Sequence, residues 1–525
     1  MIVPSMKSLA SSKDAPPRHS NALAEMPSYG LNLATIAVVP LYPLDVAGFC
    51  SEFVSALNEI APAALLEKSD LRKVVGEKTF QPKNAMHEMK MTRFLGDMEE
   101  KYRLVVYRAD VKYTWWTQLA ITQADCILLL VRADEIPEKQ QVEQCLAWAH
   151  ESKGVRIELV IISEKATSDE ECSDVREEVD DWTENREWVT GSQRIRLPFD
   201  HHGLDFERMC RRITGRAVGL ALGGGGARGI AHLGIIRALM EAGITVDMVG
   251  GTSQGAYIGA LYAESPDSPD IFTRKAREMS ETMASFKEKL FDLTLPMTSM
   301  FSGYRFNLGI QKSFGNTRIQ DLVLNFFCVS VDLQKRSQVV HTKGKLWKFV
   351  RASMSLTGYL PPISENGSLL VDGGYLNVVP ADVMRHQMRA RTVIAVDVSP
   401  QTERNYYEYG THLSGWWLLW NSWNPFVTTV NVPSMGDISD TLRWVSSDQH
   451  RKQVVNDADL YLTPPVGGYG TLEYDKFDEI MELSYQYAKP IIDAWVKQNP
   501  WVCGPPRDVV EAKPVKGLRR YKSDS

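Results

Sequence analysis

The sequence lacks several features that would place it in a common class of protein. It has no run of about 18 uncharged apolar residues, and therefore no candidate transmembrane helix. Residues 1–30 are rich in Ser, Pro, Ala and charge without an apolar core, which predicts a disordered leader rather than a secretory signal. The seven cysteines include no C-x-x-C pair and are odd in number, which favours a reducing, cytosol-facing compartment.

The charge and metal-ligand patterns of nucleic-acid-binding and metal-dependent proteins are missing too. The net charge is -6 at pH 7, and no zinc-finger or RNP-like spacing occurs, which disfavours nucleic acid as a partner. No group of His, Cys and Asp has metal-ligand spacing, so we expect neither a metal nor a cofactor. A hydrophobic fraction of 44% over 525 residues is that of an ordinary globular protein with two or three domains.

What the sequence does contain is two stretches where short apolar runs alternate with helical patterns. This alternation predicts parallel sheets covered by helices, and hence the α/β fold class. The first stretch has neither G-x-x-x-x-G-K-[ST] nor G-x-G-x-x-G, so it is predicted to be a Rossmann-like scaffold without a phosphate loop. We expect a leader at 1–30, the scaffold domain at 31–200, a linker helix at 201–216, a second α/β domain at 217–385, its C-terminal extension with a Trp-rich segment at 386–505, and a basic disordered tail at 506–525. The second domain is also expected to contain a long polar insertion at 265–300.

A glycine-rich loop, GGGGARG at 223–229, follows the first strand of the second domain. Consecutive glycines let several backbone N–H groups point at one position beside a helix N-terminus, which suits a phosphate or a transient oxyanion. A Walker A loop is excluded because the Lys and Ser or Thr are missing. A dinucleotide site is disfavoured because the next strand ends in a serine motif instead of a ribose-binding acid. The predicted oxyanion hole consists of Gly224, Gly225 and Gly226, supported by Arg228 and Gly229.

Ser253 lies in a G-x-S-x-G motif between a strand predicted at 246–250 and a helix. This context matches a nucleophile elbow, in which the small residues Gly251 and Gly255 permit a strained turn that exposes the hydroxyl. A serine hydroxyl needs a base to remove its proton. That base is either a lone aspartate or, in the order of α/β-hydrolases, one of three histidines: His386, His412 or His450.

Asp372 is the candidate for a lone aspartate, because it ends an apolar run and precedes Gly373 and Gly374. These glycines let the backbone approach the serine, and partial desolvation makes a carboxylate a better base. An ordinary Asp-Gly-Gly turn is the alternative explanation of the same residues. His232, in the helix after the glycine loop, is interpreted as structural.

In this order, the glycine loop, Gly-Thr-Ser-Gln-Gly at 251–255 and Asp-Gly-Gly at 372–374 resemble the patatin-like phospholipase family. Segments at 295–307, 350–363, 373–385 and 415–425 are further similar to the catalytic half of the neuropathy target esterase subfamily. The resemblance implies a patatin-like three-layer α/β/α catalytic domain after the smaller Rossmann-like domain. It also implies a lysophospholipase that acts on lysophosphatidylcholine or phosphatidylcholine through an acyl-enzyme, with Ser253 as nucleophile and Asp372 as base, without histidine, metal or cofactor.

The resemblance also carries expectations about location. Members of that subfamily have a transmembrane segment and cyclic-nucleotide-binding-like domains upstream, which this sequence does not contain, so we expect a truncated product or a short form. The expected location is the cytosolic face of intracellular membranes, by resemblance the endoplasmic reticulum.

The Trp-rich segment at 415–426 is either a peripheral membrane contact or a buried helix, and six basic residues in the tail could add attraction to anionic lipid. Protein partners are not indicated by any motif. Two alternative functions stay open: an esterase with a Ser/Asp/His triad, and a catalytically inactive lipid-binding scaffold.

Overall fold

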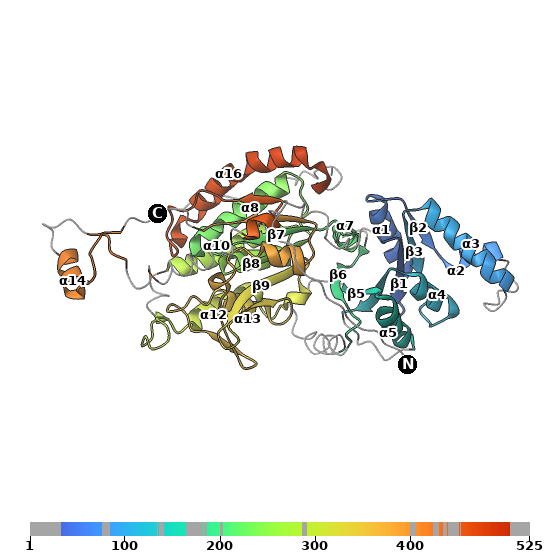
Figure 1. The fold of residues 1–525 in the computed structure, drawn as a ribbon, viewed down its shortest axis with the longest axis horizontal. Coiled ribbons are helices and arrows are strands. Elements are labelled where there is room, and N and C mark those ends of the chain that lie inside the picture. Colours follow the sequence, from blue (N-terminus) through green and yellow to red (C-terminus); the bar gives the residue numbers. More distant parts are fainter. Residues whose placement is uncertain are drawn as a thin grey trace, which may run out of the picture.

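The computed structural model describes residues 33–75, 85–133, 135, 141–163, 182, 186–199, 203–285, 291–399, 406–423, 430–433, 438, 451 and 453–503. These residues form a smaller α/β domain followed by a larger one, as Figure 1 shows. The α/β fold class expected from the alternating apolar runs is therefore confirmed.

The first domain is built on a six-stranded parallel sheet in the order β2-β3-β1-β4-β5-β6. Its strands are β1 (Thr35–Pro40), β2 (Ala63–Leu66), β3 (Leu104–Arg108), β4 (Cys126–Arg132), β5 (Arg156–Ser163) and β6 (Gly191–Arg196). The helices are α1 (Val46–Asn58), α2 (Lys68–Val75), α3 (Ala85–Lys101), α4 (Trp115–Gln123), α5 (Val142–Lys153) and α7 (Gly203–Ile213). The central strands β1 and β4 are almost wholly buried because helices cover both sheet faces, which explains their continuous apolar sequences.

The turn after β1 has an acidic group where a phosphate-binding loop would have glycines. Asp45 caps α1, and its carboxylate accepts a 2.9 Å hydrogen bond from the backbone N–H of Gly48. An anionic side chain thus occupies the helix N-terminus that nucleotide-binding folds leave for phosphate.

The second domain contains an eight-stranded mixed sheet in the order β11-β12-β9-β8-β7-β13-β14, with β10 paired to β9. Its strands are β7 (Val218–Leu222), β8 (Met248–Thr252), β9 (Asn325–Asp332), β10 (Ser337–His341), β11 (Ile363–Glu365), β12 (Ser368–Asp372), β13 (Thr392–Val396) and β14 (Leu460–Leu462). Its main helices are α8 (Ala231–Glu241), α9 (Gln254–Glu264), α10 (Pro269–Ala284), α12 (Tyr304–Phe314), α13 (Leu346–Ser353), α14 (Gly415–Trp423) and α16 (Phe477–Gln498). The segment predicted as a C-terminal extension thus supplies β13, which pairs with β7 inside this sheet.

Successive residues of the central strands enter different cores. In β13, Ile394 and Val396 belong to the core shared with α8, α9 and α16, whereas Val393 and Ala395 belong to the core on the opposite face. That second face is covered by residues 378–390, which include a short π-helix (Val383–Gln387). The sheet therefore lies between two layers, and α16 packs along α8 on one side (Figure 1).

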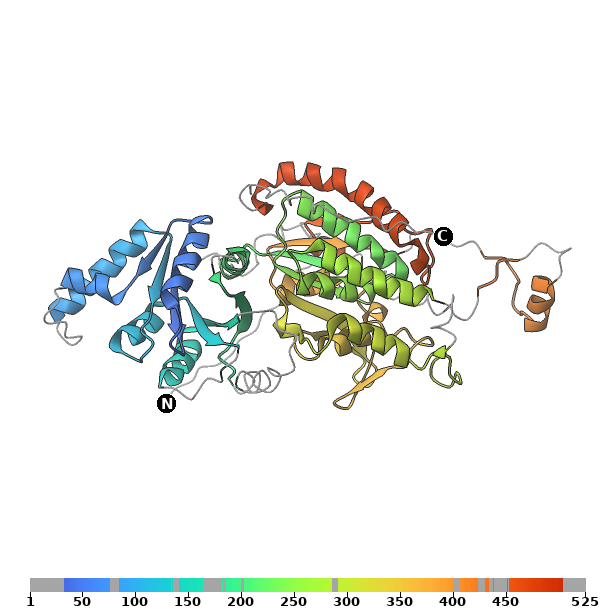
Figure 2. The same ribbon diagram turned by 180° about the vertical axis from the view of Figure 1, so that it is seen from behind.

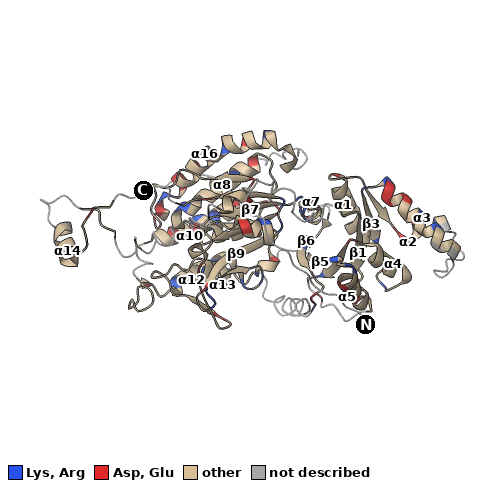
Figure 3. Cartoon of the chain, in the orientation of Figure 1, with Lys and Arg blue, Asp and Glu red and all other residues tan. Residues whose placement is uncertain are grey.

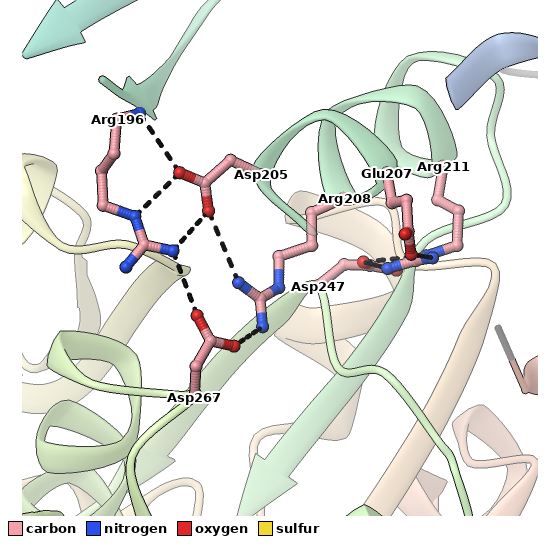
Figure 4. A network of polar contacts seen from close by, with 7 residues as sticks. All are labelled: Arg196, Asp205, Glu207, Arg208, Arg211, Asp247 and Asp267. Carbon is pink, nitrogen blue, oxygen red and sulfur yellow. Dashed lines mark hydrogen bonds and ion pairs between the residues drawn. The ribbon is translucent and has the colours of Figure 1, made fainter. Parts of the chain in front are cut away.

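Helix α7, predicted as a linker, joins the two domains through two chemically different faces. Its apolar residues Phe206 and Cys210 lie in the core of the first domain with Phe49. Its arginines extend to acidic groups of the second domain, as Figure 4 shows: Arg208 contacts Asp267 at 2.8 Å. Further ion pairs of this junction, called here the α7 network, are Arg196–Asp205, Arg196–Asp267, Arg208–Asp205, Arg211–Glu207 and Arg211–Asp247.

Helix α14 lies apart from the sheet and its covering helices in both Figure 1 and Figure 2. It contains no charged residue, which Figure 3 shows as an uninterrupted tan helix. The side chains of Trp416, Trp420 and Trp423 are 81%, 71% and 81% exposed, so the structure does not bury them in the domain. None of the described helices combines the length and apolar character needed to cross a bilayer.

Candidate active site

Ser253 lies in the sharp turn between β8 and α9, and its backbone is strained. Its φ of 55° is in the left-handed region, which costs a residue with a side chain about 1–3 kcal/mol. The turn is tight because the backbone of α9 approaches that of β7: a Cβ on Gly255 would lie 2.3 Å from the carbonyl oxygen of Leu222. This is the strained strand-to-helix turn that the G-x-S-x-G motif predicts.

Strand β9 brings Ser253 and Asp372 together although they are far apart in sequence. β8 runs parallel to β9 and ends where Thr252 pairs with Val329, while β12 runs antiparallel and ends where Asp372 pairs with Ser330. Because β10 pairs with residues 328–332 on the other edge of β9, β8 and β12 occupy successive stretches of the same edge. Their carboxyl ends therefore meet, and the residues at those ends face one another.

The two side chains are in direct contact. Ser253 Oγ donates a hydrogen bond of 2.8 Å to Asp372 Oδ2, and Asp372 Oδ1 accepts one of 2.8 Å from the backbone N–H of Gly374. Asp372 is buried, while Ser253 retains partial exposure. A Cβ on Gly373 would lie 2.3 Å from the carbonyl oxygen of Val329, so glycine is required for the turn to pack against β9. A desolvated carboxylate held in this way can accept the serine proton.

His386, one of the histidines considered as an alternative base, has a different partner. His386 Nε2 lies 3.0 Å from Asp457 Oδ1, and its imidazole is largely exposed. His412 belongs to the segment that carries α14, and His450 lies outside the described residues. In the described part of the chain, Ser253 Oγ donates to Asp372 Oδ2 and not to an imidazole.

The glycine loop lies against Ser253, and its amides are not equivalent. A Cβ on Gly224 would be 3.2 Å from Ser253 Cβ, but the Gly224 N–H donates to the carbonyl of Val378 at 3.0 Å. Gly226 lines the cavity that contains Ser253. In this conformation the Gly224 N–H is already engaged, whereas none of the backbone hydrogen bonds of the described residues is donated by Gly225 or Gly226.

The residues predicted to support the loop contact two neighbouring segments. Arg228 is buried, and its Nη1 donates to the carbonyl of Tyr469 at 3.0 Å. The N–H of Ala227 donates to the carbonyl of Thr471 at 2.9 Å. Gly229 allows close packing on α9, because a Cβ there would lie 2.5 Å from Gln254 Cγ. These contacts fix the loop relative to the serine turn.

A cavity with mostly apolar walls leads to Ser253 and Asp372. Its lining includes methionines, aromatic and aliphatic side chains: Met279, Met283, Phe301, Phe306, Met354, Leu356, Leu360 and Leu472. Methionine is flexible and polarizable, so such walls adapt to apolar chains of different shape. Arg305 is the only cationic side chain among the residues that line this cavity in the described part of the chain.

Sequence reasoning missed the residues that position the serine turn. Ser353 accepts a 2.8 Å hydrogen bond from the N–H of Ser253, and its Oγ donates to the carbonyl of Val329 at 2.5 Å. Arg351, buried and bonded to Ser355 Oγ at 2.5 Å, holds the segment whose carbonyl accepts from the N–H of Asp372. Both lie in the segment 350–363 used for the family resemblance, but no local pattern indicates a contact 100 residues away.

His232 is a buried imidazole that contacts the glycine loop. Its Nε2 lies 2.7 Å from the carbonyl oxygen of Gly223, and its Nδ1 has no hydrogen-bond partner among the described residues. Burial lowers the pKa of this imidazole from 6.5 to about 4. Below pH 6.5, the unfolded chain therefore binds a proton at His232 that the folded chain does not bind. The free energy of unfolding consequently decreases as the pH falls from 6.5 towards 4.

We expect this single group to account for about 3 kcal/mol of lost unfolding free energy between pH 6.5 and pH 4. Urea unfolding at several pH values, compared between the wild type and His232→Gln, measures it. The difference between the two profiles should change over this interval, because other groups such as the buried His341 contribute equally to both proteins. A constant difference would contradict the prediction.

Comparison with known proteins identifies both domains. Residues 32–216 match the model of the Neuropathy Target Esterase family P-loop like domain, and residues 220–385 match that of Patatin-like phospholipase. The chain is 39% identical to patatin-like phospholipase domain-containing protein 7 of Mus musculus, with 89% of this chain and 36% of that protein covered. It is 38% identical to the domain-containing protein 6 of Homo sapiens, with 92% and 36% covered, and 36% identical to lysophospholipase nte1 of Neurospora crassa, with 89% and 34% covered.

The chain thus spans about a third of the length of these curated relatives. Among solved structures, VipD from Legionella pneumophila aligns with a TM-score of 0.30 and 15% identity over 53% of this chain and 66% of that chain, a likeness too weak to support an inference. The resemblance first indicated by the glycine loop, the serine turn and the Asp-Gly-Gly turn is confirmed by the family models. Residues 32–216 and 220–385 belong to the neuropathy target esterase P-loop-like and the patatin-like phospholipase domain families, respectively.

Proposed function

We propose that this protein hydrolyses fatty acyl esters of lysophospholipids or phospholipids, with Ser253 as nucleophile and Asp372 as base. The observation that carries the proposal is the 2.8 Å hydrogen bond from Ser253 Oγ to the buried carboxylate of Asp372, beside an apolar cavity. The names of the relatives, among them lysophospholipase and neuropathy target esterase, support an ester of this class.

The proposed reaction has two steps that share one proton carrier. Ser253 Oγ attacks the ester carbonyl while its proton passes to Asp372, and the N–H groups of Gly225 and Gly226 bind the developing oxyanion. Asp372 then gives the proton to the departing glycerol oxygen, which leaves an acyl group on Ser253. In the second step, water transfers a proton to Asp372 and attacks this acyl group; Asp372 then returns the proton to Ser253 Oγ as the fatty acid leaves, which restores the serine. The alternative function, a catalytically inactive lipid-binding scaffold, would have no serine hydroxyl activated in this way.

Peripheral contact with membranes is part of this proposal. The exposed indoles of α14 form an uncharged surface of the kind that favours the headgroup region of a bilayer. The interpretation of this segment as a helix buried in the domain has no support from its exposure. We propose the cytosolic face of intracellular membranes as the site of action.

A side-by-side assay tests the reaction and its substrate. We expect hydrolysis of lysophosphatidylcholine or phosphatidylcholine to exceed that of monoacylglycerol, measured by release of fatty acid. An organophosphonate probe should label the wild-type protein, because only an activated serine reacts with it. Absence of both labelling and hydrolysis would favour the lipid-binding scaffold.

A further inference from the structure

Residues 291–304, named here the rim loop, present an apolar surface to solvent. The sequence FDLTLPMTSMFSGY contains one charged residue, Asp292, which is buried. Phe291, Leu295 and Met297 are 71%, 77% and 85% exposed, and the other large apolar side chains exposed here are Leu293, Met300 and Tyr304. The sequence predicted a polar insertion at 265–300. Residues 291–300, the last part of that segment, are instead largely apolar and carry exposed apolar side chains.

Hydrogen bonds hold this exposed loop in place. Asp292 accepts from Ser302 Oγ at 2.5 Å and from the N–H of Gly303 at 3.0 Å. The N–H of Thr294 donates to the carbonyl of Met300 at 3.0 Å, and the N–H of Met300 donates to that of Gly358 at 2.8 Å. Because the backbone is fixed while the apolar side chains point outward, their exposure is not relieved by packing within the described chain. An exposed apolar surface of this kind marks an interaction site.

The rim loop is continuous with the cavity at Ser253. Phe301 belongs to the loop, and Phe306 follows the loop in α12; both line the cavity together with Arg305. The guanidinium carbon of Arg305 lies 5.2 Å from the centre of the exposed Phe291 ring, so this cation stands where the cavity meets the loop. An apolar surface with a cation at its inner edge matches a phospholipid layer, which offers acyl chains below and phosphates at the headgroup level.

We propose that the rim loop docks on the surface of a phospholipid bilayer, so that an acyl chain passes from the bilayer to Ser253 without crossing water. Arg305 then lies at the level of the lipid phosphate. This inference rests on the proposed function for the identity of the substrate, but the docking is measured separately from catalysis. It differs from contact through α14, which lies apart from the domain.

The test uses the full chain and vesicles of phosphatidylcholine. We expect the double variant Leu295→Ser/Met297→Ser to bind vesicles about tenfold more weakly or worse, because two inserted apolar side chains are lost. Hydrolysis of vesicle lipid should fall in parallel, whereas hydrolysis of a soluble short-chain ester should persist, since neither side chain lines the cavity. The matched control is Met86→Ser/Met89→Ser, which removes two exposed apolar side chains from α3 of the other domain and should leave binding unchanged.

Three results would overturn the docking proposal. The first is unchanged vesicle binding of the rim-loop variant. The second is equal loss in the α3 control. The third is a wild-type oligomer, seen by light scattering, that becomes monomeric in the rim-loop variant, because a second copy of the chain would then cover the loop.

A Trp416→Ser/Trp417→Ser/Trp420→Ser variant tests the contribution of α14 to vesicle binding. If this variant loses binding and the rim-loop variant does not, the membrane contact belongs to α14. Absence of any ester hydrolysis by the wild type, with binding as expected, would refute the proposed function and not the docking.

Discussion

Ester hydrolysis by the Ser253→Ala protein should be lower than that of the wild type by at least about a thousandfold. The substitution removes the oxygen that carries the acyl group in the proposed reaction, and it deletes this single atom at a partly exposed turn. Asp372→Asn should lose nearly as much, because an amide cannot accept the serine proton across the 2.8 Å hydrogen bond. Both variants should retain the far-ultraviolet circular dichroism and unfolding cooperativity of the wild type.

Histidine variants provide the matched controls for this prediction. His386 is exposed and contacts Asp457, so His386→Ala should keep wild-type activity. The same is expected for His412→Ala and His450→Ala, and all three should still react with the organophosphonate probe. Activity in Asp372→Asn together with its loss in one of these histidine variants would replace the proposed pair with a Ser/Asp/His triad.

Asp247→Ala should destabilise the second domain by about 3–5 kcal/mol, as expected when a buried ion pair loses one partner. Asp247, which is 4% exposed, accepts from Arg211 Nε at 3.0 Å, from Arg211 Nη2 at 2.8 Å and from the N–H of Val218 at 2.8 Å. It therefore joins α7 of the first domain to the start of β7 and β8 (Figure 4). Burial disfavours the charged guanidinium, but Asp247 raises the pKa of Arg211 above its usual value. Without Asp247, the partly buried Arg211 keeps its longer contact with Glu207 at 3.6 Å but loses its closest acidic partner, and the buried N–H of Val218 loses its acceptor.

An exposed ion pair in the same domain gives the control. Arg277 contacts Asp478 at 2.5 Å, and these side chains are 38% and 72% exposed. Asp478→Ala should cost no more than about 1 kcal/mol, because water solvates both groups after the change. Urea denaturation of the two variants, followed by tryptophan fluorescence, compares the costs. Equal destabilisation by Asp247→Ala and Asp478→Ala would show that burial of the α7 network does not govern its contribution.

The local features of this protein were predictable from sequence because they depend on near neighbours. Strands β9 and β13 follow from apolar runs, and the strained turn at Ser253 follows from the small residues beside it. The composition of the glycine loop likewise predicts an anion-binding site without knowledge of distant residues. Asp372 was selected by its position after an apolar run, although Asp-Gly-Gly by itself describes an ordinary turn.

Tertiary structure decided which of these groups meet. The contact between Ser253 and Asp372 depends on β8 and β12 sharing one edge of β9, a register that no local pattern encodes. The engagement of the Gly224 N–H by Val378 likewise depends on a distant segment, as does the support of Ser253 by Ser353. The tertiary structure also determines how far each histidine is buried: His232 is enclosed and contacts the carbonyl of Gly223, whereas His386 is exposed. The sequence by itself determined the chemical groups and their local turns, because these depend on residues within a few positions. Only the tertiary structure decided the pairing, solvation and access of those groups, because these depend on packing between segments 100 or more residues apart.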